Sequence, residues 1–170
     1  MRKVVIRQAV SPADFDAARS LCWEYRDYLL GHSEEVRNAV SVRYSEANYT
    51  AIMAGLEKEH ARPKGVVFLA EVDGAPVGCG MTHPLSDLDA EIKRVYVRES
   101  VRGKGIASQI SKALMQQARK DGYKRIFLDT SRLFSHAQKM YEKLGFKKRH
   151  PYSDETPEIN AFLVFYEFTL

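Results

Sequence analysis

The stretch from residue 90 to residue 129 constrains the fold more than any other part of this chain. It begins with a strand-like segment, Ala90–Val97, and continues through a glycine-containing loop, Arg102–Gly105. A long helix with apolar side chains on one face follows, and Gly122 ends it. The buried strand Arg125–Asp129 completes the unit. Two strands joined through a helix lie parallel in one sheet, so we predict an α/β fold with at least one parallel pair.

A hairpin signal precedes this unit. The dipeptide Asp73-Gly74 separates two strand-like runs, 66–72 and 75–81, and both of its residues tolerate the positive φ of a tight hairpin turn. Helical spacing and strand-like runs predict further helices at 12–30, 45–60 and 135–144, and further strands at 3–8, 146–149 and 161–169. A mixed sheet with helices on both faces accommodates all of these elements.

Composition is that of an ordinary globular protein. Of the 170 residues, 45% are hydrophobic and 28% are charged, and the formal net charge is +4. We therefore expect a single domain over residues 1–170 and, because the basic excess is small, no nucleic-acid partner. The sequence has no run of about 18 apolar residues, so we expect no membrane association. Cys22 and Cys79 stand far apart and predict no disulfide framework, which favours the reducing cytoplasm.

The loop before the long helix is a candidate site for a diphosphate. The first amides of a helix have no partner inside it, and together with the helix dipole they attract anions. Gly103 and Gly105 allow a bulky anion to approach the backbone, and Arg102 and Lys104 add positive charge. The P-loop pattern does not explain this segment, because Arg98 stands where its first glycine belongs.

The dinucleotide-binding fingerprint fits this loop in part. Gly103 and Gly105 match its first two glycines, and Asp129 ends the next strand, where a ribose-binding acid belongs. Ser108, however, stands where a glycine or alanine is required. The fingerprint also wants its first glycine directly after the strand, and five residues separate Val97 from Gly103. A nicotinamide-dependent oxidoreductase therefore stays an alternative at this point.

A third pattern matches residue by residue. Arg102, Gly105 and Ala107 occupy the fixed positions of R-x-x-G-x-A, the coenzyme A loop of GNAT acetyltransferases. About 35 residues downstream, Ala137–Phe146 resembles the second signature of that superfamily, A-x-x-x-Y-x-x-L-G-F. Two signatures in the right order are far more specific than either one alone.

Two further runs strengthen the resemblance. Glu91–Val97 and Leu128–Thr130 are similar to the E-x-K-R-x-Y-V and L-D-T runs of small acetyltransferases in this superfamily. One position departs from the family pattern, because Phe134 stands where many members carry asparagine. The resemblance implies a GNAT-like α/β fold, with a mixed, mostly antiparallel sheet of six to seven strands flanked by about four helices.

The resemblance also implies acetyl-CoA as co-substrate, held by the strand that ends at Val97 and by the loop and helix start after it. The residues expected to contact it are Val95, Tyr96, Val97, Arg102, Gly103, Lys104, Gly105, Ile106, Ala107 and Ser108. The implied reaction is direct attack of a neutral primary amine on the acetyl thioester. The amine belongs to a small molecule or a peptide that the sequence does not identify, and the family also allows a homodimer.

Tyr141 is the candidate general acid. It is the tyrosine of the second signature and shares a helix face with Ala137 and Leu144. In the family this tyrosine points at the coenzyme sulfur, and a phenol with a pKa of about 10 is protonated at neutral pH. The alternative is a core tyrosine that only packs beneath the sheet.

Glu91 is the candidate general base, because the family often draws a base from this strand. Along a regular strand it would share a face with Lys93, Val95 and Val97. The alternatives are an ion pair with a neighbouring basic residue and deprotonation of the amine through a water chain. A non-catalytic domain that senses acyl-CoA is the alternative function. The histidines show no ligand spacing, so we expect no metal ion.

Overall fold

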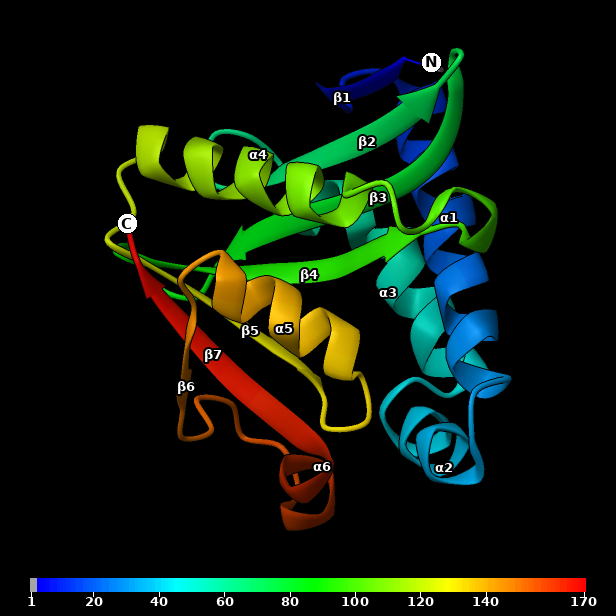
Figure 1. Ribbon diagram of the computed structural model, residues 1–170, viewed down its shortest axis with the longest axis vertical. Coiled ribbons are helices and arrows are strands. Elements are labelled where there is room, and N and C mark those ends of the chain that lie inside the picture. The colour runs from blue at the N-terminus through cyan, green and yellow to red at the C-terminus, as the bar shows by residue number, and fades with distance from the viewer. Residues whose placement is uncertain (1–2) are drawn as a thin grey trace.

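The computed structural model describes residues 3–170; Met1 and Arg2 of the predicted domain lie outside the described residues. Within them, seven strands form one sheet in the order β1-β2-β3-β4-β5-β7-β6 (Figure 1). The strands are β1 Val4–Gln8, β2 Val66–Val72, β3 Ala75–Pro84, β4 Asp89–Val97, β5 Arg125–Ser131, β6 Lys147–Arg149 and β7 Leu163–Thr169. The β4–β5 pair is parallel and the other pairs are antiparallel. The predicted mixed, mostly antiparallel sheet is confirmed.

The helices outnumber those predicted. They are α1 Pro12–Leu30, α2 Glu34–Arg43, α3 Glu46–Glu59, α4 Ile106–Lys120, α5 Ser135–Lys143 and α6 Pro157–Phe162, with a 3-10 turn at Glu99–Val101. The prediction of about four lacked α2 and α6. In α2 the buried side chains are Val36 and Val40, an apolar stripe too short to show helical periodicity. The six residues of α6 precede β7 directly, so part of this helix was predicted as strand.

Local signals explain several element boundaries. The Ser11 side chain accepts a hydrogen bond from the Asp14 amide at 3.2 Å, and the Asp14 side chain accepts one from the Ser11 amide at 3.0 Å. This reciprocal cap starts α1. Asp73 and Gly74 have φ values of 52° and 81°, which is the left-handed conformation of the predicted tight turn between β2 and β3.

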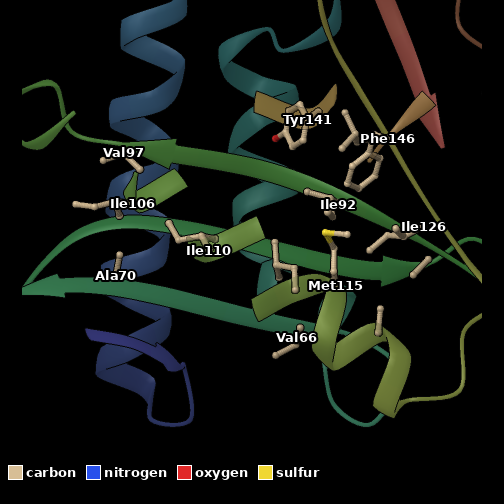
Figure 2. Close-up of a cluster of buried hydrophobic side chains, with 14 of the residues drawn as sticks. Val66, Ala70, Ile92, Val97, Ile106, Ile110, Met115, Ile126, Tyr141 and Phe146 are labelled. Carbon is tan, nitrogen blue, oxygen red and sulfur yellow. The ribbon is translucent and has the colours of Figure 1, made fainter. Parts of the chain in front are cut away.

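The sheet separates two hydrophobic layers. On one face, α4 and α5 pack over β-strand residues, and Figure 2 shows Ile110 of α4 and Tyr141 of α5 directed toward the layer that contains Ile92. On the other face, α1 and α3 pack over Leu69 and Met81. Figure 1 shows β4 at the centre of the sheet, so its side chains reach both layers.

A bulge interrupts β4. Cys79 of β3 pairs with Tyr96 and Met81 pairs with Lys93, so β4 carries one more residue than β3 over this interval. Arg94 lies within the extra segment and has a φ of 52°. A bulge of this kind reverses the alternation of side chains along the strand.

The bulge corrects one prediction about Glu91. Ile92 precedes the bulge and Val95 and Val97 follow it, yet all three side chains pack in the layer beneath α4. Glu91 and Lys93 alternate with Ile92 and therefore lie on the opposite face. The prediction that Glu91 shares a face with Val95 and Val97 is wrong, because it assumed regular alternation.

Candidate active site

β4 and β5 diverge in the middle of the sheet. They pair where Asp89–Glu91 lie beside Arg125–Phe127, and beyond this point they separate (Figure 1). Within residues 3–170, Ile92–Val97 have no paired partner in β5. Backbone groups on this edge are therefore available to bond a ligand. The edge ends at the loop that precedes α4.

That loop presents unpaired amides. Gly103 and Gly105 have φ values of 78° and 71°, a region that glycine adopts without strain. Gly105 is the N-cap of α4, and no side chain caps this helix. In the described part of the chain, the amides of residues 105–108 donate to no protein acceptor. Such amides and the helix dipole together make an anion site.

Several predicted coenzyme-contacting residues have structural partners. The Nε atom of Arg102 donates to the Val97 carbonyl at 2.9 Å, and its guanidinium lies 4.3 Å from the Tyr28 ring centroid. Arg102 thereby ties the loop back to the end of β4. The side chains of Tyr96, Val97 and Ile106 are buried in the two hydrophobic layers, so their predicted contacts would use backbone atoms.

Tyr141, on α5, lies in the same hydrophobic layer as the apolar face of α4 and has 6% of its surface exposed. Its ring packs edge-on against Phe146, with the centroids 5.6 Å apart, and its oxygen points away from Phe146 (Figure 2). Burial raises the pKa of the phenol well above its usual range. The phenol is therefore protonated at neutral pH. That state suits a general acid, and the burial equally suits a packing role.

Glu91 is buried among three partners. Its Oε1 atom accepts from His83 Nε2 at 2.8 Å and lies 3.2 Å from Lys93 Nζ, and its Oε2 atom accepts from the Tyr152 hydroxyl at 2.5 Å. Burial raises the pKa of this carboxyl. The hydrogen bonds from His83 and Tyr152 and the charge of Lys93 outweigh burial and lower the pKa to about 2. Glu91 is therefore an ionised carboxylate with both oxygens occupied.

Two partners of Glu91, His83 and Tyr152, were not predicted from the sequence. His83 lies directly opposite Glu91 in the β3–β4 pairing, so the register of these two strands would have revealed it. Tyr152 lies 61 residues from Glu91 in the chain, and no local pattern connects the two.

A cavity, here called the charged cavity, lies beside the diverging edge of β4. It measures about 650 Å³, including the space at its mouth, and its walls come from α1, α2, α6, the middle of β4 and the end of β5. Its charged lining residues are Arg43, Lys93, Arg94 and Asp129. The two helices that the sequence did not predict, α2 and α6, thus help to form this cavity.

Asp129 is committed to Arg43 within the charged cavity. Arg43 Nη1 donates to Asp129 Oδ1 at 3.1 Å and Nη2 donates to Oδ2 at 3.0 Å. Arg43 Nε also donates to Glu155 at 2.9 Å. Asp129 is therefore not a free acid at the end of its strand, as the dinucleotide-binding alternative would require.

The fold and sequence both resemble acetyltransferases. The PaiA N-acetyltransferase of Thermoplasma acidophilum, solved with coenzyme A, has a TM-score of 0.71 at 18% identity, covering 99% of each chain. The acetyltransferase yncA of Salmonella typhimurium, solved with acetyl-CoA, has a TM-score of 0.68 at 17% identity, covering 98% of this chain and 94% of that one. The uncharacterized N-acetyltransferase YjgM of Escherichia coli is 31% identical over 117 residues, 64% of this chain and 70% of YjgM.

A sequence model of the acetyltransferase (GNAT) family matches residues 15–146. The chain belongs to this family. The predicted resemblance is thereby confirmed, and this GNAT protein is an acetyltransferase whose acyl donor is a coenzyme A thioester. The nicotinamide-dependent alternative no longer applies.

One position sets this GNAT protein apart from many members. Phe134 is the N-cap of α5 and makes no capping hydrogen bond, a function that an asparagine at this position would serve. Its ring lies 5.0 Å from that of His32, and the side chain lines the charged cavity. The substitution replaces a polar cap with part of an apolar wall.

Neither a metal cluster nor a membrane span is found within residues 3–170. No group of three or more His, Cys, Asp or Glu side chains there is placed to hold a metal ion, and no helix combines the length and apolar character needed to cross a membrane. The single domain, the cytoplasmic location, the homodimer and the lack of a nucleic-acid partner stay predictions.

Proposed function

We propose that this GNAT protein transfers the acetyl group of acetyl-CoA to a primary amine of a small acceptor by direct attack. The observation that carries the proposal is the diverging edge of β4. Ile92–Arg94 line the charged cavity, and Val97 adjoins the loop of unpaired amides. A donor lying along this edge would bring its thioester to the cavity that admits the acceptor.

The chain fits the donor at two places. The unpaired amides of residues 105–108 are suited to a diphosphate. The backbone of Val95–Val97 on the edge facing β5 is suited to the amide groups of a pantetheine arm. Gly103 and Gly105 have open space where a Cβ would stand, so the backbone is accessible to a bulky anion.

Besides deprotonation of the ammonium, the proposed chemistry requires two contributions from the protein. The amine nitrogen forms a bond to the carbonyl carbon of the thioester, and the carbon–sulfur bond breaks. Backbone N–H groups of β4 near the Arg94 bulge stabilise the oxyanion between these events. Tyr141 donates its phenolic proton to the departing thiolate and regains one from the proton that the attacking nitrogen loses as the amide forms, while the proton lost earlier by the ammonium goes to solvent.

The low pKa of Glu91 disfavours direct transfer of the ammonium proton to this carboxylate. Moving a proton from an α-ammonium group of pKa about 8 to a carboxylate of pKa about 2 costs about 8 kcal/mol. Releasing the same proton to solvent at pH 7 costs about 1.4 kcal/mol. We therefore propose that the proton leaves through a water chain, and that the charge of the buried Glu91 carboxylate stabilises the positive charge on that chain.

A screen of amines tests this proposal. The protein is incubated with acetyl-CoA and each of a set of amino acids, peptides, polyamines and aminoglycosides, and free thiol release is followed together with the mass of the product. We expect an acceptor-dependent thiol release and a product heavier by one acetyl group. Tight acetyl-CoA binding without acetylation of any amine would refute catalysis and support the acyl-CoA-sensing alternative.

A further inference from the structure

Arg94 is a half-buried cation that forms no ion pair with another described residue. Its Nε and Nη1 atoms are buried and bond to no acceptor among the described residues. The other two cations that line the charged cavity have anionic partners. Arg43 pairs with Asp129 at 3.0 Å, and Lys93 lies 3.2 Å from Glu91. Of the three cations, Arg94 is therefore the one that forms no ion pair within residues 3–170.

Two costs coincide at Arg94. A guanidinium does not lose its proton in proteins, and two of its buried N–H donor atoms are left without an acceptor in the described part of the chain, which costs free energy. The residue also has a φ of 52°, a conformation that non-glycine residues adopt with strain. Both costs arise at the bulge of β4, beside the edge where the acetyl group is proposed to lie. An unpaired cation in this position is suited to a ligand that supplies the missing anion.

We infer that the acceptor carries an anionic group beside its amine, and that Arg94 binds this group. This inference rests on the proposed function of the same cavity. A carboxylate, as in an amino acid or a short peptide, would accept hydrogen bonds from the guanidinium. A polyamine would instead add cations beside Arg43, Lys93 and Arg94.

Matched acceptors test this assignment. Each amino acid is compared with its own carboxamide, which keeps the amine and the side chain but removes the negative charge; phosphoethanolamine and spermidine complete the set. The wild-type kcat/KM should favour the acid over its amide by about 10- to 100-fold, as expected for hydrogen bonds to charged groups. A higher value for phosphoethanolamine would identify phosphate as the anionic group. Equal values for acid and amide, or a preference for spermidine, would overturn the inference.

Two variants assign the preference to Arg94. Arg94→Met removes the charge and keeps an unbranched side chain, and it should bring the acid-to-amide ratio close to one while the KM for acetyl-CoA is unchanged. Arg94→Lys restores a positive charge and should recover part of the ratio. A ratio that Arg94→Met leaves at the wild-type value would assign the preference to another residue and overturn the role of Arg94.

The thermal stability of the protein tests the anion site without requiring catalysis. Removing buried donor atoms that have no acceptor removes an unfavourable desolvation, so Arg94→Met should unfold at a higher temperature than the wild type. Malonate, a small dicarboxylate, should raise the Tm of the wild type and leave that of Arg94→Met unchanged. A lower Tm for Arg94→Met, with no effect of malonate on the wild type, would overturn the anion site.

The same measurements separate the two proposals. If malonate stabilises the wild type through Arg94 but no amine is acetylated, the anion site stands and the proposed function fails. If amides are acetylated as fast as acids and the ratio does not depend on Arg94, the proposed function stands and the inference fails.

Discussion

Gly105→Ala is the most direct test of the coenzyme loop, because the structure supplies a matched control. Gly105 lies at the start of α4 and Gly122 follows its end, with φ values of 71° and 92°. A Cβ added at either position meets nothing within 4 Å. The two substitutions therefore impose the same kind of backbone strain without a clash in the protein. Only the first lies where the donor diphosphate is proposed to bind.

The stability cost can be estimated for both variants. Holding an alanine in the left-handed region costs about 1–2 kcal/mol, and 1 kcal/mol corresponds to a Tm change of about 2–4 °C for a domain of this size. We expect Gly105→Ala and Gly122→Ala to lower the Tm by similar amounts, about 2–8 °C. Thermal unfolding without ligand measures this effect and shows that both variants fold.

The effect on binding should differ between the two variants. A methyl group at residue 105 would keep the diphosphate from the adjacent amides, and each weakened bond to a charged group is worth about 1.5–3 kcal/mol. The Kd for acetyl-CoA should therefore rise by about 10- to 100-fold in Gly105→Ala and stay at the wild-type value in Gly122→Ala. Isothermal titration calorimetry measures both. Equal Kd values for the two variants would refute the placement of the diphosphate at this loop.

Three other predictions concern buried titratable groups. Tyr141→Phe should lower kcat about 100-fold or more without changing acetyl-CoA affinity. The control is Tyr166→Phe, which removes another hydroxyl from the same hydrophobic layer. A Tyr141→Phe variant that works at the full rate would assign this tyrosine to packing. Glu91→Gln should lower the unfolding free energy at pH 7 by on the order of 3 kcal/mol. Because the folded-state pKa of Glu91 is lowered to about 2, its contribution to the free energy of unfolding is present above the unfolded pKa of about 4.3 and is lost as the pH falls toward 2. A difference in unfolding free energy between wild type and variant that persists at pH 2 would contradict this. Burial lowers the pKa of His60 to about 4, so this imidazole binds its proton on unfolding, and wild-type stability should fall between pH 6.5 and 4. His60 Nδ1 donates to the Thr82 carbonyl at 2.8 Å, and His60→Asn keeps a donor at this position. The variant should lose the pH dependence of the unfolding free energy, as measured by denaturant titrations at a series of pH values. An unchanged dependence of unfolding free energy on pH would show that another group titrates.

Short-range sequence signals predicted the parts of this protein that depend on adjacent residues. Ser11 and Asp14 start α1 through their own side chains, and Asp73-Gly74 forms the hairpin turn because both residues adopt positive φ. Gly103 and Gly105 of the loop before α4 likewise adopt positive φ. Both family signatures lie on such segments, which is why the sequence alone was enough to predict the glycine-containing loop before α4 and the helix of Tyr141.

The tertiary structure decided which residues meet across the sheet. The bulge at Arg94 depends on the register between β3 and β4, and it reversed the face predicted for Val95 and Val97. Tyr152 reaches Glu91 from a distant segment. The charged cavity joins α2 and α6 to the diverging strands. The backbone conformation of a turn depends on a few neighbouring residues, whereas the pairing of buried charges depends on which strands and helices pack together, and no local pattern encodes that choice.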